Sequence, residues 1–299
     1  MLTVRAPATS ANLGPGFDCL SLALDIANVV EARPADCVSV EVVGEGAGQL
    51  PTDATNEVYR ALGSVFASRG KPPPLLRLRC ENVIPTSRGL GSSSAARASG
   101  LLLGNALLDD PLSPDELLRL GAEQEGHPDN IAACLLGGIQ VCVSRDGRVE
   151  HCRVPVGIPL RAVVYVPDFP MNTNRARGLL PREVPVETAV YNISRAALLV
   201  AALATGRTDL LRTATEDAIH QPPRTKVFPA LPILLSAALE AGAHGAFLSG
   251  AGSSVLALVD EERATAVGEA LAARAAEEGV RGRVLQAGIA ERGATVERD

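Results

Sequence analysis

A glycine- and serine-rich segment in the first third of the chain has the residue types of a phosphate-binding loop. It reads Arg88-Gly89-Leu90-Gly91-Ser92-Ser93-Ser94 and joins a predicted strand to an alanine-rich predicted helix. Glycines let the backbone approach a ligand closely, and free N–H groups at a helix N-terminus bind anions. The serines add hydroxyl groups, one of which could ligate Mg²⁺. Neither a Walker A lysine nor a G-x-S-x-G nucleophile elbow is present, and a simple N-capped turn is the alternative.

Three further segments carry side chains that could bind a substrate, and two of them also contain glycine. Residues 12–18 place an amide and a carboxylate after the first predicted strand, and residues 249–254 form a glycine–serine turn between two others. Residues 127–130, His-Pro-Asp-Asn, follow a predicted helix that carries Glu123 and Glu125. Carboxylates so arranged could hold Mg²⁺ and orient a hydroxyl group. Each segment alone could be a solvated turn or a helix cap, but the four together indicate a binding site.

The elements that must position these segments mix strands and helices along the whole chain. Strands are expected at 1–6, 19–32, 36–43, 75–80, 139–143, 161–166, 246–248, 255–259 and 284–288. Helices are expected at 56–69, 92–108, 113–125, 127–136, 187–204, 208–219, 229–241 and 261–278. Residues 7–18 are expected to be a loop, and residues 155–159 the junction between two halves. This order indicates an α+β fold.

The composition excludes several classes of protein. The 299 residues carry a net charge of −6, no Trp and only 3% aromatic residues, so no nucleic-acid-binding surface is indicated. We find no secretory signal and no apolar run of the ~18 residues that a membrane span needs. The six cysteines form no C-x-x-C pair, which favours free thiols in a reducing compartment over a zinc site. We therefore expect a cytoplasmic protein whose partners are small molecules, neither nucleic acid nor membrane.

Three segments, 7–18, 85–95 and 249–254, resemble in order the motifs of the GHMP kinases, the superfamily of galactokinase, homoserine kinase and mevalonate kinase. Within it, residues 9–18, 125–130 and 173–181 are similar to segments typical of the homoserine kinases. The resemblance implies an α+β fold of two domains. Residues 1–154 would form a ribosomal protein S5 domain 2-like domain with the ATP phosphate loop, and residues 155–299 a ferredoxin-like domain.

The activity that the resemblance implies is transfer of the γ-phosphate of ATP to the side-chain hydroxyl of L-homoserine, in threonine biosynthesis. ATP and Mg²⁺ would be required, and the family suggests a homodimer. Asn12 and Asp18 would contact the amino acid, Asp18 at its ammonium group. Asp129 would lie near the hydroxyl group, as a base or only to orient it. Arg177 and Arg224 would bind the α-carboxylate, which suits the bidentate geometry of Arg.

The resemblance also assigns the nucleotide and the metal. Gly252 would approach the substrate or support the phosphate loop, and Ser93 and Glu123 would hold Mg²⁺, with Glu125 as the alternative to Glu123. The residues implied for ATP, with Asn56 at the adenine, are Asn56, Pro85, Arg88, Gly89, Leu90, Gly91, Ser92, Ser93 and Ser94. Two readings stay open besides a homoserine kinase. One is another GHMP kinase, of the mevalonate pathway or for a sugar, and the other is a non-catalytic small-molecule sensor on the same fold.

Overall fold

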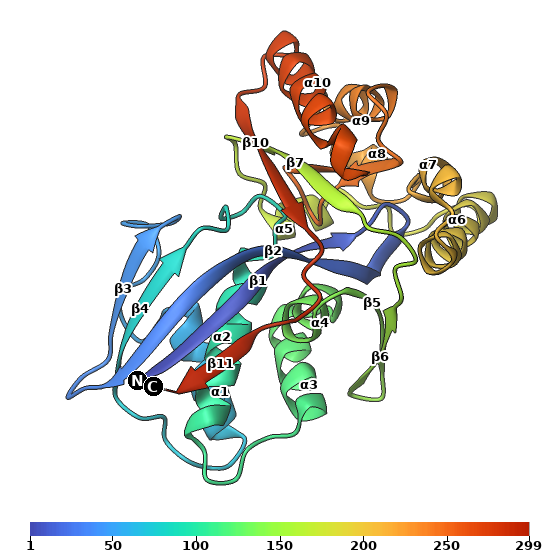
Figure 1. Ribbon diagram of the computed structural model, residues 1–299. Coiled ribbons are helices and arrows are strands. Elements are labelled where there is room, and N and C mark those ends of the chain that lie inside the picture. Colours follow the sequence, from blue (N-terminus) through green and yellow to red (C-terminus); the bar gives the residue numbers. More distant parts are fainter. Residues whose placement is uncertain (299) are drawn as a thin grey trace.

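The computed structural model describes residues 1–298, and its larger sheet has seven strands (Figure 1). The order is β11-β1-β2-β4-β3, with β5 paired to β2 and β6 paired to β5. The strands are β1 (Leu2–Asn12), β2 (Gly16–Pro34), β3 (Ser39–Gly44), β4 (Leu76–Asn82), β5 (Ile139–Arg145), β6 (Arg148–Val154) and β11 (Thr295–Arg298). All pairs are antiparallel except β3 with β4.

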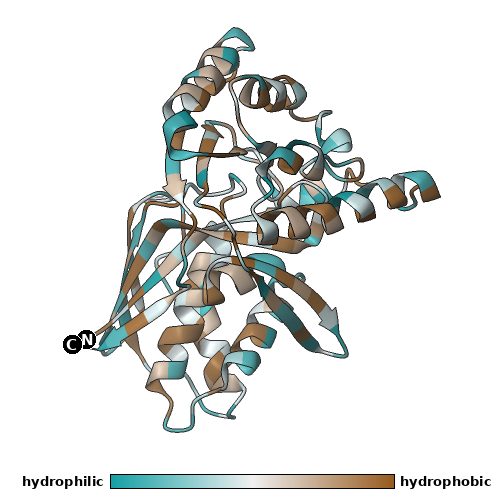
Figure 2. Cartoon of the chain, turned by 45° about the vertical axis from the view of Figure 1, so that its right-hand side comes forward, coloured by the Kyte–Doolittle hydropathy of each residue, from teal (hydrophilic) through white to brown (hydrophobic). Residues whose placement is uncertain are grey.

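Four helices cover one face of this sheet and carry most of the apolar residues beneath it (Figure 2). They are α1 (Glu57–Ala67), α2 (Ser92–Leu107), α3 (Pro114–Glu125) and α4 (Asp129–Leu136). The start of α3 confirms the sequence prediction, because Ser113 accepts a hydrogen bond from the Glu116 N–H and the Glu116 side chain accepts one from the Ser113 N–H. Glycines at positions 100 and 104 let α2 approach α1, since an added Cβ at Gly100 would lie 2.1 Å from the carbonyl oxygen of Val58.

The second sheet has four antiparallel strands in the order β10-β7-β9-β8, with α9 and α10 packed on it (Figure 1). These elements are β7 (Arg161–Pro167), β8 (Gly245–Leu248), β9 (Val255–Val259), β10 (Gly282–Gly288), α9 (Leu231–Glu240) and α10 (Ala264–Glu277). Between them lie α5 (Thr173–Arg177), α6 (Val186–Thr205), α7 (Leu211–Ala214) and α8 (Gln221–Arg224). The helix expected at 208–219 is wrong beyond Ala214, where the chain turns irregularly into α8.

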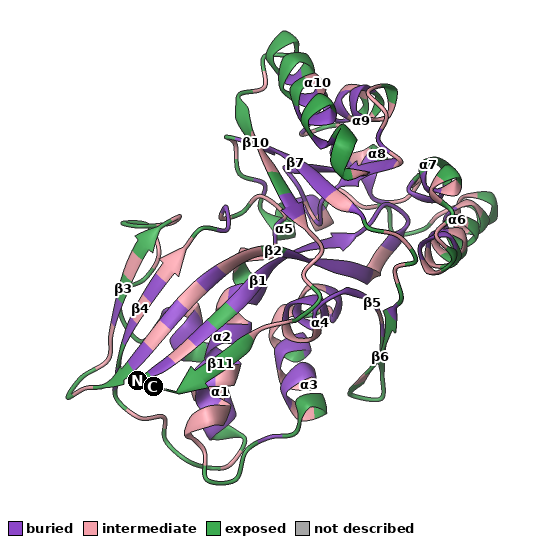
Figure 3. Ribbon diagram, in the orientation of Figure 1, coloured by how far each residue is buried: buried purple, intermediate pink, exposed green. Residues whose placement is uncertain are grey.

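The first strand does not end where the sequence indicated. Residues 7–12 continue β1 as buried strand, with register shifts at Pro7/Ala8 and Ala11/Asn12, although proline and small polar residues suggested a loop. These residues are strand because they pair with the 19-residue β2. The β1–β2 hairpin extends into the space between the two sheets. Figure 3 shows the end of β1 as buried, while the start of β2 is partly buried. The hairpin therefore brings residues 12–18 to the boundary between the two sheets.

The boundary expected at 154/155 falls between β6 and β7, but the second unit does not include the whole remainder of the chain. Strand β11 returns to the first sheet and pairs with β1, from Leu2 opposite Arg298 to Arg5 opposite Thr295. The two ends of the chain therefore lie side by side (Figure 1). Strand β11 is short and lacks the alternation of apolar and polar residues that predicts a strand, so it could not be predicted without its partner strand.

Helix α6 is the one described helix long and apolar enough to span a membrane by length and composition. This helix differs from the expectation that the chain has no segment long and apolar enough to span a membrane. Leu199 and Leu203 pack this helix into the main core, while Val186, Val190 and Ile193 are exposed on its other side. The helix thus has one face in the core and an apolar stripe on the surface.

Candidate active site

A cavity of about 280 Å³ lies where the two sheets meet, and all four segments singled out in the sequence contribute to it. Its residues come from the β1–β2 turn, the glycine–serine loop, the α3–α4 junction, α5, α8 and the β8–β9 turn. The residues contributed by the β1–β2 turn, the α3–α4 junction and the β8–β9 turn are Ala11, Asn12, Phe17, Asp18, Glu125, His127, Asp129, Asn130, Gly250 and Ala251. The prediction that these distant segments form one site agrees with this geometry.

The glycine–serine loop ends at the N-terminus of α2, with Gly91 as N-cap at φ +67°. The N–H groups of the first helical turn have no partner within a helix and are available to an anion. Two glycines are required by close contacts. An added Cβ at Gly91 would lie 1.9 Å from Oγ1 of Thr9, and one at Gly89 would lie 2.1 Å from the carbonyl oxygen of Ser249. The loop is therefore held against β1 and the β8–β9 turn.

Three of the residues expected to contact ATP lie where they support the loop. Arg88 lines the cavity, but its Nε donates to the Pro167 carbonyl at 2.9 Å and its Nη1 to the Thr86 carbonyl at 2.7 Å. Its guanidinium thus joins the loop to the end of β7, which leaves few donors for a phosphate. Pro85 is buried outside the cavity, and Leu90 belongs to the hydrophobic core. Ser92, Ser93 and Ser94 all line the cavity.

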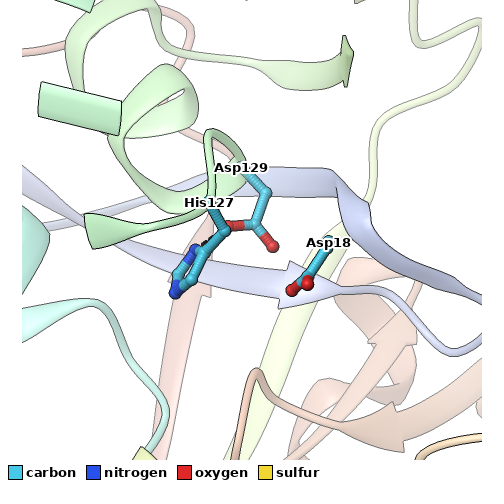
Figure 4. Close-up of side chains that lie close together, drawn as sticks. All are labelled: Asp18, His127 and Asp129. Atoms are coloured by element: carbon cyan, nitrogen blue, oxygen red, sulfur yellow. Dashed lines mark hydrogen bonds and ion pairs between the residues drawn. The ribbon is translucent and has the colours of Figure 1, made fainter. Parts of the chain in front are cut away.

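Asp129, the first residue of α4, is buried with its carboxylate at the cavity (Figure 4). Its Oδ1 accepts hydrogen bonds from Nδ1 of His127 at 2.7 Å and from the Asn130 N–H at 2.7 Å. Burial alone would lower the pKa of His127, but the hydrogen bond and charge of Asp129 raise it above its usual value. These contacts fix one oxygen of Asp129 and leave the other toward the cavity and Asp18 (Figure 4).

Asp18 and Arg177 form a bidentate ion pair across the cavity, with N···O distances of 2.9 and 2.5 Å. The hydrogen bond to Asp18 raises the pKa of Arg177. Asn12 supports this pair, because its Oδ1 accepts from the Asp18 N–H and its Nδ2 donates to the Gly250 carbonyl. Asp18 and Asn12 both have left-handed φ, at 57° and 72°, a conformation that Asp and Asn tolerate better than most residues.

Asp18, His127 and Asp129 bring three potential metal ligands within 4.8 Å of one another. Each already has a strong partner, since Asp18 pairs with Arg177 and His127 with Asp129. A cluster so paired is suited to hydrogen-bonding a polar substrate more than to holding an ion.

Arg224 enters the cavity from α8 with only 1% of its surface exposed. Its Nη1 donates to Nδ1 of His220 at 2.6 Å and to the Gly250 carbonyl at 3.0 Å, and its Nε is buried without a partner. Within residues 1–298 no carboxylate lies within 4.0 Å of it. Burial lowers the pKa of Arg224 to about 10. A buried guanidinium without a counterion is costly, and an anionic ligand would relieve that cost.

The structure favours Glu125 over Glu123 as the acidic residue of the site. The Glu123 side chain is 52% exposed, pairs with Arg119 on the surface of α3 and does not line the cavity. Glu125 lies on the opposite side of the helix, is 2% exposed, and has an Oε2 without a hydrogen-bond partner. Burial raises the pKa of Glu125, while Ser94 and Arg97 act against this. Of the two glutamates named for the metal, the position of Glu125 therefore suits that role and the position of Glu123 does not.

A second cavity, of about 420 Å³, adjoins the first and shares Ser87, Ser92 and Ser93 with it. Asn56 lies at its wall, caps α1 through the Val58 N–H, and donates from Nδ2 to the Pro51 carbonyl. This position agrees with the expectation that Asn56 borders a nucleotide pocket.

Gly252 does not reach the main cavity, where Gly250 and Ala251 form the wall. Its N–H donates to the Ser249 carbonyl, and an added Cβ would lie 3.1 Å from Sδ of Met171. Of the two expected roles, support of the phosphate loop is the one this position suits.

Comparisons with known proteins agree with this geometry. The model for the GHMP kinase N-terminal domain matches residues 56–138, and the model for the GHMP kinase C-terminal domain matches residues 199–277. Homoserine kinase of Moorella thermoacetica is 44% identical over 299 residues, which is 99% of this chain and all of that protein. Homoserine kinase of Gloeobacter violaceus is 45% identical over 91% of this chain and 92% of that protein.

The chain belongs to the homoserine kinases of the GHMP kinase family. The crystal structure of homoserine kinase from Cytophaga hutchinsonii superimposes with a TM-score of 0.89 at 30% identity, covering 99% of this chain and 97% of that one. The predicted family and two-domain fold are thereby confirmed.

Two charged residues at the site were not expected from the sequence. Arg97 lines the cavity and joins Glu57 at 2.7 Å to Glu125 at 3.3 Å. His220 is fully buried behind Arg224. Arg97 lies one turn after the serines on the same helix, which could have pointed to it. His220 lies four residues before Arg224, but the irregular chain around it gave no such signal.

Proposed function

We propose that this chain transfers the γ-phosphoryl group of ATP to the side-chain hydroxyl of L-homoserine. The observation that carries the proposal is buried Arg224, a cation without a carboxylate partner among the described residues, in the same cavity as Asp18 and Asp129. An amino acid presents one anionic and one cationic group, and this cavity has a counterpart for each. The glycine–serine loop at the other side of the cavity supplies the phosphate site.

The substrate's carboxylate would be bound by Arg224 and Arg177, and its ammonium group by Asp18. Because Asp18 and Arg177 now neutralise each other at 2.5 and 2.9 Å, a bound zwitterion would exchange one ion pair for two. This exchange lowers the cost of separating the pair.

Asp129 would orient the hydroxyl group and accept its proton as the hydroxyl oxygen bonds to the γ-phosphorus, while the bond from that phosphorus to the β–γ bridging oxygen breaks and ADP leaves. The fixed Oδ1, held by His127 and the Asn130 N–H, leaves Oδ2 for this contact. Positioning of the two reactants could supply ~7–11 kcal/mol of the barrier. The N-terminus of α2 would stabilise negative charge on the phosphate oxygens.

Mg²⁺ fits the residues present. The unpartnered, buried Oε2 of Glu125 and the hydroxyl of Ser93 are hard oxygen donors of the kind that Mg²⁺ prefers. Glu125 and Ser93 would hold the ion, which when bound neutralises charge on the β- and γ-phosphates. Arg97 and Ser94 keep the carboxylate of Glu125 in place. The second cavity, with Asn56 at its wall, would receive the adenosine.

A test is ADP release by the purified protein with ATP, Mg²⁺ and one of three alcohols: L-homoserine, mevalonate or galactose. We expect ADP only with homoserine. Preference for mevalonate or galactose would reject the proposal in favour of another GHMP kinase. ATP binding without ADP release from any of the three would favour a sensor.

The same proposal includes the cellular location, the pathway and the oligomeric state of the enzyme. It would act in the cytoplasm in threonine biosynthesis, and the six described cysteines are all free thiols. A homodimer is also proposed, and the exposed apolar stripe of α6, with Val186, Val190 and Ile193, would be its contact surface. Light scattering on wild type and on Ile193→Glu tests this, and a wild-type monomer at micromolar concentration would reject it.

A further inference from the structure

His220 is fully buried next to the cavity, and its two ring nitrogens make different hydrogen bonds. Nε2 lies 2.7 Å from the carbonyl oxygen of Gly14, which can only accept, so Nε2 carries the hydrogen. Nδ1 lies 2.6 Å from Nη1 of Arg224, which can only donate, so Nδ1 is unprotonated. The two neighbours together require the neutral Nε2–H tautomer.

The direction of the Arg224 side chain depends on this histidine. Nη1 is shared between His220 and the Gly250 carbonyl, and Nε has no partner. In the part of the chain that the structure describes, the guanidinium has no carboxylate within ion-pair distance. A long side chain without an ion pair is held only by such neutral acceptors and by packing. His220 supplies the shorter of the two hydrogen bonds.

We propose that His220 is a positioning residue that aims Arg224 at the carboxylate of the amino-acid substrate. The inference rests on the proposed function, because it takes the carboxylate as the ligand of Arg224. A neutral acceptor is needed here, since a carboxylate in place of His220 would neutralise Arg224 and weaken its attraction for the substrate. A protonated histidine would lose the acceptor and repel the arginine.

The surroundings hold the ring of His220 in its position. Phe17 stacks on it with ring centroids 5.4 Å apart, and the Phe17 ring also lies 5.3 Å from the guanidinium carbon of Arg177 and 5.8 Å from that of Arg224. Asp217, whose side chain is fully buried, accepts hydrogen bonds from the backbone N–H groups of residues 219, 220 and 221. The turn that carries His220 is thereby fixed before α8 begins.

Charge near His220 is mixed, but its neutral form is favoured. Burial lowers the pKa of His220 to about 4, with Arg224 acting in the same direction and Asp217 and Asp18 against it. The Asp217 carboxylate is 3.8 Å from Nε2 and is already engaged by Asn192 and the backbone. At neutral pH the acceptor that Arg224 requires is therefore present.

Two variants distinguish the roles of the two ring nitrogens of His220. His220→Asn places an oxygen near Nδ1 and so keeps an acceptor for Arg224, whereas His220→Gln keeps a donor for Gly14 and loses that acceptor. We expect His220→Gln to raise KM for L-homoserine on the order of ten- to a hundredfold, the range for loss of a hydrogen bond to a charged group. KM for ATP should change less than about twofold, and His220→Asn should recover most of the loss.

A second background tests whether His220 acts through Arg224. In Arg224→Lys, His220→Gln should change KM for homoserine by less than about threefold, because the group it positions is gone. An equal effect of His220→Gln in both backgrounds, or equal rises in KM for ATP and homoserine, would overturn the inference. His244→Gln is the control, since His244 pairs with Asp260 away from the cavity.

Folding is checked by thermal unfolding of each variant. If His220→Gln does not fold, His220→Asn alone decides: KM for homoserine within about threefold of wild type supports the inference, and a tenfold rise overturns it. A wild-type protein that releases no ADP with homoserine would reject the proposed function instead. The two failures are thus distinguishable.

Discussion

Replacing Glu125 by Gln should remove most of the Mg²⁺-dependent activity, whereas Glu123→Gln should leave it nearly unchanged. The two residues are two positions apart on α3 and face opposite ways. Glu125 is 2% exposed with an unpartnered Oε2, and Glu123 is 52% exposed and pairs with Arg119 at 2.6 Å. The pair therefore forms a matched test of which carboxylate holds the metal.

The magnitudes follow from these environments. Residues that merely support a metal ligand contribute about ten- to a hundredfold in affinity or activity, so loss of the ligand should lower kcat/KM at limiting Mg²⁺ by more than about a hundredfold. Glu123→Gln removes one exposed i, i+4 pair worth about 0.3–0.5 kcal/mol of stability. Because Glu123 does not line the cavity, kcat/KM should change by less than about twofold. In Glu125→Gln, Arg97 keeps its 2.7 Å contact with Glu57. The loss of unfolding free energy should therefore stay below the ~3–5 kcal/mol of an orphaned buried charge.

The assay is ADP release with homoserine at fixed ATP while Mg²⁺ is titrated, with thermal unfolding of both variants beside it. A Glu125→Gln enzyme with the Mg²⁺ dependence of wild type would refute the assignment. So would a Glu123→Gln enzyme that folds normally but loses its activity.

Three further predictions concern single residues. Asp129→Asn should lower kcat by about 10²–10⁴-fold if this residue takes the proton; turnover near wild type with weaker homoserine binding excludes general-base chemistry there. Gly91→Ala should raise KM for ATP at least about tenfold, because its Cβ would lie 1.9 Å from Oγ1 of Thr9, whereas Gly70→Ala, with φ +64° and open space around it, should cost only ~1–2 kcal/mol of stability and no activity. His220 has a folded pKa of about 4 against an ordinary 6.5, so the unfolded chain takes up a proton first on acidification. Its stabilising contribution is complete above pH 6.5 and should fall by about 2 kcal/mol between pH 7 and 5; urea unfolding at both pH values should show a smaller decrease for His220→Gln, and an equal decrease contradicts the argument.

Much of the site was predictable because its residues occur in short runs of consecutive positions in the sequence. Glycine at positions 89 and 91 followed by three serines indicates a helix N-terminus open to an anion, and the structure has α2 begin at Ser92. Regular elements with strong periodicity, such as α1 and α3, were also predicted to within a few residues. Their N-caps, Asn56 and Ser113, are residue types that favour the start of a helix, because their side chains accept hydrogen bonds from N–H groups of the first turn.

Other features depended on contacts between distant residues. The strand character of residues 7–12 comes from pairing with β2, and β11 exists only because β1 offers a free edge. Glu123 and Glu125 have the same residue type and the same helix, and only the packing of α3 against α2 decides which one is buried. Helical periodicity alone could not choose between them without knowing which face meets the core.

The sequence by itself determined the family and the glycine–serine loop, and it indicated the charged residues that we propose to bind an amino acid, because these are properties of residue type and short spacing. Only the tertiary structure decided how the charges are paired. It joined Asp18 to Arg177 and left buried Arg224 facing the cavity with His220 behind it. The physical reason is that burial and distance set the energy of a charge. Both arise from contacts between elements far apart in the sequence, such as Asn12 and Gly250, which are 238 residues apart.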